Sequence, residues 1–225
     1  MTKRIDYTAK DGSMLAAEIG EPEGSGKAPA LVIVQEYWGI NDHIRTLVDR
    51  FAAEGFLAIA PDLYHGAVAK TAEEARTLMG GLDKAKAVKE IGDAVAYARA
   101  HERCSGKVGV TGFCLGGALA FAAAATHKGL AAVAPFYGLP GAPLPWDKVT
   151  APILAHFAKT DPWATVAGAE EIKRAIDAAK KTTMELHVYD AKHAFMRDSD
   201  PTVYDEPSSK LAWKRTLDFL HTHLG

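Results

Sequence analysis

Cys114 lies at the centre of the segment Gly112-Phe113-Cys114-Leu115-Gly116, in which a glycine stands two residues before and two residues after a potential nucleophile. This is the spacing of a nucleophile elbow, a sharp strand-to-helix turn whose glycines let the strand and the helix cross without side-chain collision. A helix N-terminus carries partial positive charge, which favours the thiolate form of a cysteine. A buried structural cysteine fits the short motif equally well, because free cysteines are among the most buried residues.

Two further polar residues follow Cys114 in the chain order that elbow hydrolases use, nucleophile, then acid, then histidine. Asp161 comes after the apolar run 151–157, and His193 comes after the run 184–189. We expect His193 to take the thiol proton and later to protonate the leaving group, while Asp161 holds the imidazole in the required tautomer. Among the nine histidines only His65 competes at this position, because the others fall on or beside predicted helices or inside predicted strands.

The loop 35–39 follows the first strongly apolar run, a position that usually supplies one backbone N–H of an oxyanion hole. We therefore expect the backbone N–H groups of Leu115 and Tyr37 to stabilise a developing oxyanion. Glu36 lies beside them, and its carboxylate opposes the negative charge that ester hydrolysis develops. From the residues alone, Glu36 has either a special role or an ordinary place in a surface loop.

Apolar runs and helical periodicity indicate the elements that must position these residues. Residues 3–8 and 13–19 flank Asp11-Gly12, which predicts a hairpin. Buried strands are predicted over 30–35, 56–60, 107–112, 130–138, 151–157 and 184–189. Helices are predicted after an Asp42 cap, near 83–101, after Leu115, over 167–180 and over 208–223. This alternation predicts an α/β fold with a mostly parallel sheet covered on both faces, and its ligands should bind beyond the strand ends at 35, 60, 111, 157 and 189.

The composition sets further limits. A chain of 225 residues with 48% hydrophobic residues fits one domain spanning 1–225. Its net charge of −2 indicates neither a nucleic-acid nor a membrane partner, and it has no apolar run of membrane-spanning length. Two cysteines cannot build a disulfide framework, and the N-terminus lacks the apolar core of a signal peptide. We therefore expect a cytoplasmic monomer or small homo-oligomer, with no metal because no ligand spacing is present.

Several segments together resemble the dienelactone hydrolase (carboxymethylenebutenolidase) family. They are QEYWGIND (35–42), APDLY (60–64), KVGVTGFCLGGALAF (107–121), the Asp161 loop, HAFMR (193–197) and RTLDFL (215–220). The resemblance implies an α/β-hydrolase fold without a cofactor and a triad of Cys114, His193 and Asp161. It also implies that Glu36 pairs with the resting thiol until substrate displaces it. The implied substrate is a lactone that carries a carboxylate, bound partly by Arg197.

The resemblance further implies a second substrate arginine between residue 64 and the predicted helix near 83. Arg76 is the only arginine in that segment, and it is the candidate. We also expect aromatic side chains to line the pocket, namely Trp38, Tyr64, Trp163 and Phe195.

The predicted function is hydrolysis of a small lactone or ester, of the dienelactone-to-maleylacetate type, through an acyl-enzyme. One alternative is a non-catalytic thiol redox sensor or binding protein on a hydrolase scaffold, because an accessible thiolate also suits redox sensing. Another is a peptidase similar to class I glutamine amidotransferases, in which histidine usually follows the cysteine, where this chain has Leu115.

Overall fold

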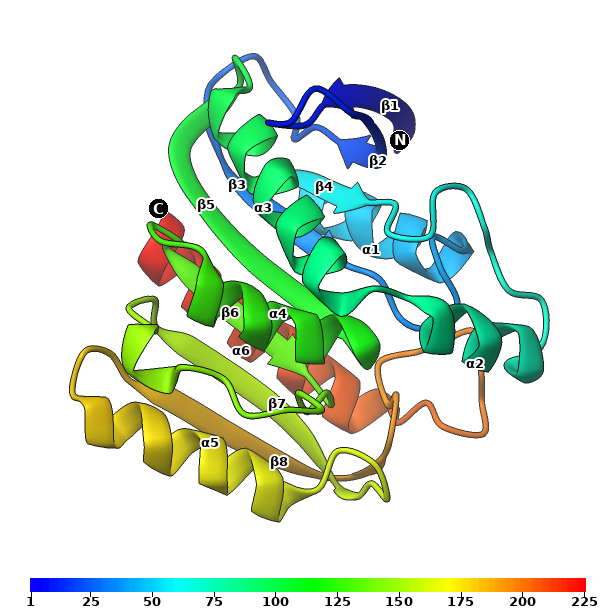
Figure 1. The fold of residues 1–225 in the computed structure, drawn as a ribbon, viewed down its shortest axis with the longest axis vertical. Coiled ribbons are helices and arrows are strands. Elements are labelled where there is room, and N and C mark those ends of the chain that lie inside the picture. The colour runs from blue at the N-terminus through cyan, green and yellow to red at the C-terminus, as the bar shows by residue number, and fades with distance from the viewer.

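The computed structural model describes all 225 residues and contains one eight-stranded sheet (Figure 1). The strands are β1 Lys3–Thr8, β2 Met14–Gly20, β3 Ala28–Val34, β4 Leu57–Pro61, β5 Cys104–Phe113, β6 Ala132–Phe136, β7 Ile153–Thr160 and β8 Met184–Lys192. Their order in the sheet is β1-β2-β4-β3-β5-β6-β7-β8. β2 pairs antiparallel with β1 and β4, and the remaining pairings are parallel. The predicted hairpin and mostly parallel sheet are confirmed.

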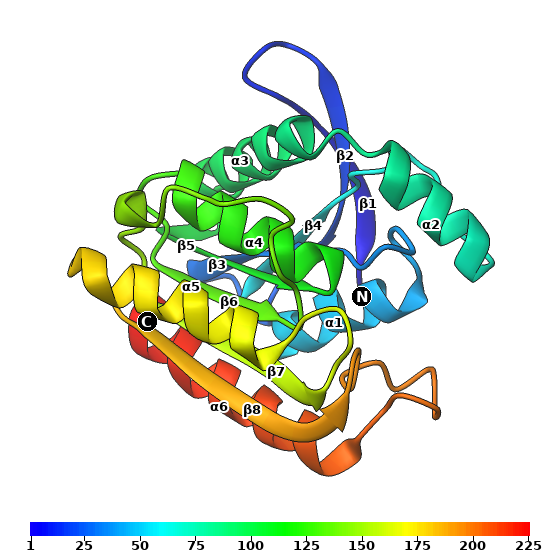
Figure 2. The same ribbon diagram turned by 60° about the horizontal axis from the view of Figure 1, so that its bottom comes forward.

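Helices cover both faces of the sheet (Figure 2). They are α1 Asp42–Ala53, α2 Ala72–Gly81, α3 Lys84–Ala100, α4 Leu115–Thr126, α5 Val166–Ala179 and α6 Glu206–Leu224, with a 3₁₀ turn η1 at Trp146–Lys148. α1 and α6 share one face, where the rings of Phe51 and Trp213 lie 4.4 Å apart. α3, α4 and α5 cover the other face. None of the helices is both long and apolar enough to cross a bilayer.

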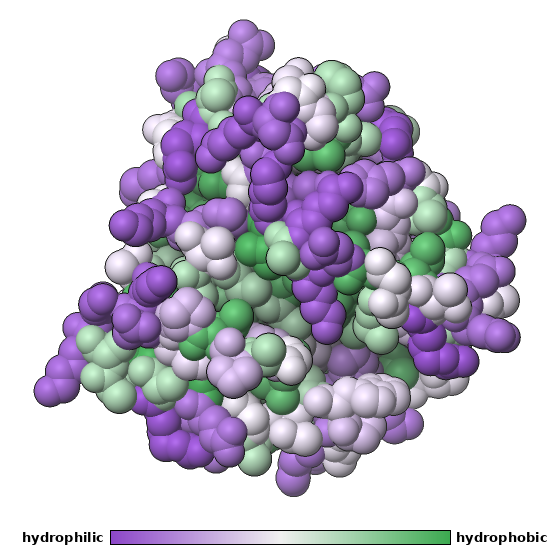
Figure 3. All heavy atoms as spheres, in the orientation of Figure 1, coloured by the Kyte–Doolittle hydropathy of each residue, from purple (hydrophilic) through white to green (hydrophobic).

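The central strands are hydrophobic along their length because the sheet is covered on both faces. Every residue of β4 and β6 is buried, as are six of the seven residues of β3. These strands belong to a continuous core of 64 buried residues. On the face that α3, α4 and α5 cover, apolar atoms gather in the middle and hydrophilic side chains surround them (Figure 3).

The structure corrects several element boundaries. The cap of α1 is Asn41, whose side chain accepts a hydrogen bond from the Ile44 N–H at 3.1 Å, and Asp42 is the first helical residue. β5, β7 and β8 run to residues 113, 160 and 192, beyond the predicted ends. The last residues of β7 are the exposed Lys159 and Thr160, so apolarity does not mark the end of that strand. α2 was not predicted, because Ala75 is its only buried residue and its apolar stripe is short, comprising Ala75, Leu78 and Met79.

Candidate active site

Cys114 stands at a strained turn between β5 and α4. Its backbone has φ +57° and ψ −116°, a conformation that costs a residue with a side chain roughly 1–3 kcal/mol. A Cβ on Gly112 would lie 2.2 Å from the carbonyl oxygen of Gly116, and a Cβ on Gly116 would lie 2.2 Å from that of Val34. Both positions therefore require glycine. The turn holds a partly exposed thiol at the carboxyl end of the strand.

Asp161 and His193 lie at the ends of the neighbouring strands β7 and β8. His193 Nδ1 and Asp161 Oδ2 are 2.6 Å apart. The other carboxylate oxygen of Asp161 accepts hydrogen bonds from the backbone N–H groups of Trp163 and Ala164, both at 2.9 Å. The Asp161 side chain has no exposed surface, so these bonds fix the carboxylate in one orientation. This leaves Nε2 as the ring atom of His193 that is available to Cys114.

The surroundings of His193 favour its protonated form. Burial lowers the pKa of His193, but the hydrogen bonds with Asp161 and Cys114 and the negative charges of these two groups outweigh it. The net result raises the pKa of His193 to about 10. The imidazole therefore holds a proton firmly when it faces the charged forms of these two groups.

Glu36 follows β3 and is almost completely buried, with 1% of its side chain exposed. Neither of its carboxylate oxygens has a hydrogen-bond partner. The opposing charge is Arg197, whose Nη1 lies 3.9 Å from Glu36 Oε2. The pairing of Glu36 with the thiol, implied by the resemblance, is thus absent from this structure, and Glu36 faces an arginine that follows β8.

Arg197 is held on three sides. Its Nη2 pairs with Asp200, its Nη1 faces Glu36, and its guanidinium lies 5.4 Å from the centre of the Trp38 ring. Only 14% of the Arg197 side chain is exposed. Trp38 therefore supports the arginine, and its own buried Nε1 has no hydrogen-bond partner.

The two expected oxyanion donors come from adjacent parallel strands. Val34 in β3 pairs in register with Gly112 in β5. The loop after β3 and the turn after β5 therefore begin side by side at the carboxyl edge of the sheet. Leu115 begins α4, where the first N–H groups have no intrahelical acceptor. The Tyr37 carbonyl accepts a hydrogen bond from the Tyr64 hydroxyl at 3.2 Å, which anchors its loop.

The charges that act on the Tyr37 phenol include that of Arg76. Burial raises the pKa of Tyr37, Arg197 lowers it, Cys114 and Glu36 raise it, and Arg76 lowers it. Arg76 is an exposed residue of α2, and its charge lowers the pKa of Tyr37. His65 lies elsewhere, with its Nε2 3.4 Å from Glu90 on α3.

Sequence reasoning missed Tyr137, which follows β6. Its side chain is fully buried, its φ is +33°, and its hydroxyl has no hydrogen-bond partner. Burial, Glu36 and Cys114 raise the pKa of Tyr137, and its ring lies 5.2 Å from that of His193. The sequence placed Tyr137 inside the predicted strand 130–138, whereas β6 ends at Phe136, so its position at a strand end was not recognised.

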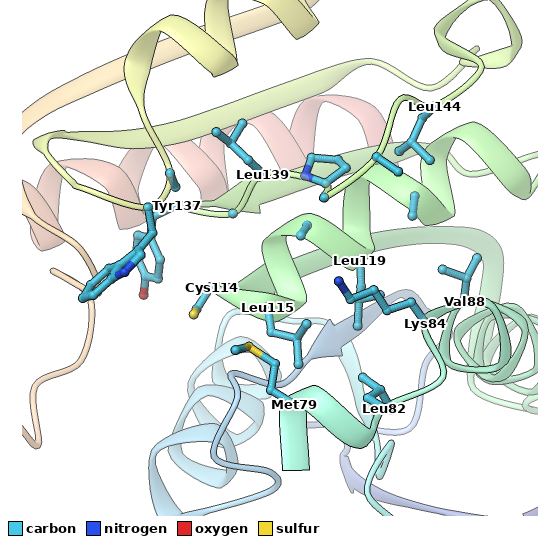
Figure 4. A pocket seen from close by; sticks show the side chains of 18 of the residues that line it. Met79, Leu82, Lys84, Val88, Cys114, Leu115, Leu119, Tyr137, Leu139 and Leu144 are labelled. Carbon is cyan, nitrogen blue, oxygen red and sulfur yellow. The ribbon is translucent and has the colours of Figure 1, made fainter. Parts of the chain in front are cut away.

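A cavity of about 700 Å³ opens beside Cys114 and His193 (Figure 4). Of the aromatic residues expected to line the pocket, Trp163 does so, and its exposed ring lies 5.1 Å from that of His193. Trp38, Tyr64 and Phe195 do not line this cavity. Phe195 is instead fully buried in the core.

Comparison with known proteins identifies relatives over nearly the full chain. Residues 15–224 match the model of the dienelactone hydrolase family. Carboxymethylenebutenolidase 1 of Cupriavidus pinatubonensis is 31% identical, and the alignment covers 96% of this chain and 95% of that protein. Carboxymethylenebutenolidase of Pseudomonas putida is 33% identical, with 98% and 96% covered.

The fold is also found among solved structures. A dienelactone hydrolase-like promiscuous phosphotriesterase from metagenomic libraries superposes with a TM-score of 0.86. The match covers 100% of this chain and 99% of that chain at 23% identity, so it supports the α/β-hydrolase fold alone.

Proposed function

The chain belongs to the dienelactone hydrolase family and is a hydrolase of carboxylic esters or lactones, and we propose that Cys114, His193 and Asp161 are its catalytic triad. The observation that supports the triad best is the 2.6 Å contact between His193 and Asp161 beside the strained Cys114. The resemblance seen in the sequence motifs is confirmed at the level of the family. The substrate that we propose is a small lactone or ester bearing a carboxylate.

In the first half of the reaction, the Cys114 thiol gives its proton to His193 and the sulfur attacks the carbonyl carbon. A carbon–sulfur bond forms while the carbonyl π electrons move to oxygen. Backbone N–H groups of Leu115 and Tyr37 donate to this oxyanion. The high pKa of His193, about 10, keeps the transferred proton on the ring until the leaving group needs it.

Collapse of the intermediate breaks the bond between carbon and the ester oxygen, which takes the proton from His193. When the substrate is a lactone, the released alcohol group remains bound to the enzyme through the thioester, because the alcohol and the acyl group belong to the same molecule. In the second half, His193 accepts a proton from water as the water oxygen attacks the thioester. The carbon–sulfur bond breaks, and the thiol and a free carboxylic acid are regenerated.

Arg197 is the proposed site for the substrate carboxylate, and Glu36 is the proposed gate. A substrate carboxylate at Arg197 competes with Glu36, whose oxygen lies 3.9 Å from the guanidinium and makes no hydrogen bond. Displacement of Glu36 from its resting position then lets the Cys114 thiolate form, with His193 as the acceptor of the thiol proton. Binding of the acidic substrate is thereby coupled to activation of the thiol.

The triad is tested by assaying Cys114→Ala and His193→Ala with a chromogenic ester and a dienelactone. Both variants should lose several orders of magnitude in kcat, whereas the matched variant Cys104→Ala should keep its activity, because Cys104 lies at the opposite end of β5. Activity at the wild-type level in either triad variant sinks the proposal. Stoichiometric reaction with peroxide without ester turnover would favour the thiol sensor instead.

The gate is tested by the alkylation rate of Cys114 in the wild type and in Glu36→Gln, with and without a carboxylate-bearing substrate analogue. In the wild type, the analogue should change the alkylation rate. In Glu36→Gln, that response should be lost. Equal rates in all four measurements would remove the gate from the mechanism.

A further inference from the structure

The cavity beside Cys114 has an apolar part to which the proposed mechanism assigns no role. We call this part the apolar arm, and its walls are formed by Leu115, Leu119, Ala122, Met79, Leu82, Leu139 and Leu144. Fifteen of the 22 residues that line the cavity are hydrophobic, and Lys84 and His193 are the only charged or titratable basic side chains among them. Glu36 and Arg197 do not line it. The arm is therefore separate from the charged group that we assign to the substrate carboxylate.

The arm follows one face of α4. Leu115, Leu119 and Ala122 recur at helical spacing and line it, and the lining continues to Thr126. At 1.5 Å per residue, this face extends roughly 16 Å from the elbow. Figure 4 shows Cys114 at one end of the cavity and Val88 and Leu144 near the other.

The opposite walls are also hydrophobic. Met79 comes from α2, Leu82 from the link between α2 and α3, and Leu139 and Leu144 from the loop after β6 (Figure 4). A volume of about 700 Å³ lies within the roughly 300–1,000 Å³ of clefts that enclose drug-sized ligands. A compact lactone occupies only a small part of it.

We infer that the substrate carries, on the side of its reacting carbonyl away from Arg197, a hydrocarbon group that lies along α4 in this arm. The inference rests on the proposed function, because it places the carbonyl at Cys114. The hydrocarbon belongs to either the acyl or the alcohol part of the ester. Each methylene buried in the arm should raise kcat/KM about four-fold until the arm is filled.

The test uses two series of chromogenic esters, one with acyl chains from acetyl to octanoyl and one in which the alcohol is lengthened. Ala122→Phe places a ring in the middle of the arm. Ala178→Phe makes the same change at an exposed position of α5 outside the cavity and is the matched control. In one series, kcat/KM should rise with chain length for the wild type and Ala178→Phe, and stop rising at a shorter chain for Ala122→Phe.

A flat or falling profile in both series, or the same rising profile in Ala122→Phe, overturns the inference. A binding measurement separates this result from a failure of the proposed triad. Octanoate should bind Cys114→Ala at least ten-fold more tightly than acetate does, measured by the change in tryptophan fluorescence that binding beside Trp163 produces. Turnover at the wild-type rate by Cys114→Ala would refute the triad alone, and equal binding of the two acids would refute the arm alone.

Discussion

Asp161 uses both carboxylate oxygens, one for two backbone N–H groups and the other for His193. In Asp161→Asn, the first oxygen keeps its role, but an amide N–H₂ group faces His193 Nδ1 and favours the wrong tautomer. We expect kcat to fall by roughly 10³–10⁴-fold, as in other hydrolytic triads. The pKa of His193 should also fall, because the hydrogen bond and the charge of Asp161 both raise it.

Steady-state kinetics and an NMR titration of the His193 ring measure the two effects of Asp161→Asn separately. Asp190→Asn is the control, because Asp190 is an exposed carboxylate of β8 close to His193 in sequence. A kcat within ten-fold of the wild type, with an unchanged His193 titration, would show that Asp161 does not orient the base.

The raised pKa of His193 also predicts how stability depends on pH. The folded-state pKa of about 10 exceeds the ordinary value of 6.5, so protonation stabilises the folded protein. This contribution is fully present below pH 6.5 and is lost as the pH rises through about 10. The free energy of unfolding of the wild type, minus that of His193→Gln, should shrink between these pH values by up to about 1.4 kcal/mol per pH unit.

Urea unfolding of both proteins at a series of pH values gives this difference directly. Because the two proteins share their other titrating groups, most contributions from elsewhere cancel. If the difference in unfolding free energy grows with pH, the folded state stabilises the neutral imidazole more than the protonated one, which contradicts the prediction.

At the scale of elements, the crossing of β5 and α4 depends on the absence of a side chain at Gly116. A Cβ there would lie 2.2 Å from the carbonyl oxygen of Val34 and 2.6 Å from that of Gln35, and neither backbone atom moves easily. Gly116→Ala should lower the free energy of unfolding by roughly 3 kcal/mol or more and reduce kcat, because Cys114 shifts with the helix. Denaturant unfolding and ester turnover measure the two effects.

Gly26→Ala is the matched control for Gly116→Ala, since a Cβ at Gly26 meets no heavy atom within 4 Å. Its free energy of unfolding should stay within about 0.5 kcal/mol of the wild type. Equal stability of the two variants would show that strand and helix can separate at little cost.

The sequence predicts the central strands well because strands buried on both faces become continuous apolar runs, as in residues 30–34. It predicts their ends less well, because Lys159 and Thr160 continue β7 with exposed side chains. The strand-end positions of Cys114, Asp161 and His193 were predictable, because each residue follows an apolar run. The cavity wall was not, since Met79 and Leu139 belong to segments without a motif and meet only in the folded chain.

At the scale of the whole molecule, the sheet brings together two loops that lie far apart in the sequence. Glu36 follows β3 and Arg197 follows β8, and β5, β6 and β7 separate these strands in the sheet. Their side chains nevertheless face each other at 3.9 Å, nearly shielded from water. We therefore expect the Glu36–Arg197 pair to couple the stability of the loop after β3 to that of the loop after β8.

Arg197→Met tests this link because it leaves Glu36 buried without its opposing charge, a change that typically costs about 3–5 kcal/mol. Glu36→Gln removes the buried charge and should cost less. The double variant should be more stable than the two separate losses predict, with a coupling energy of about 1 kcal/mol or more in urea unfolding. Arg174 and Glu170 on α5 are also 3.9 Å apart but exposed, so their cycle should give a coupling energy close to zero. Equal coupling energies in the two cycles would mean that burial adds nothing to the pair and that the loops after β3 and β8 are held in place independently.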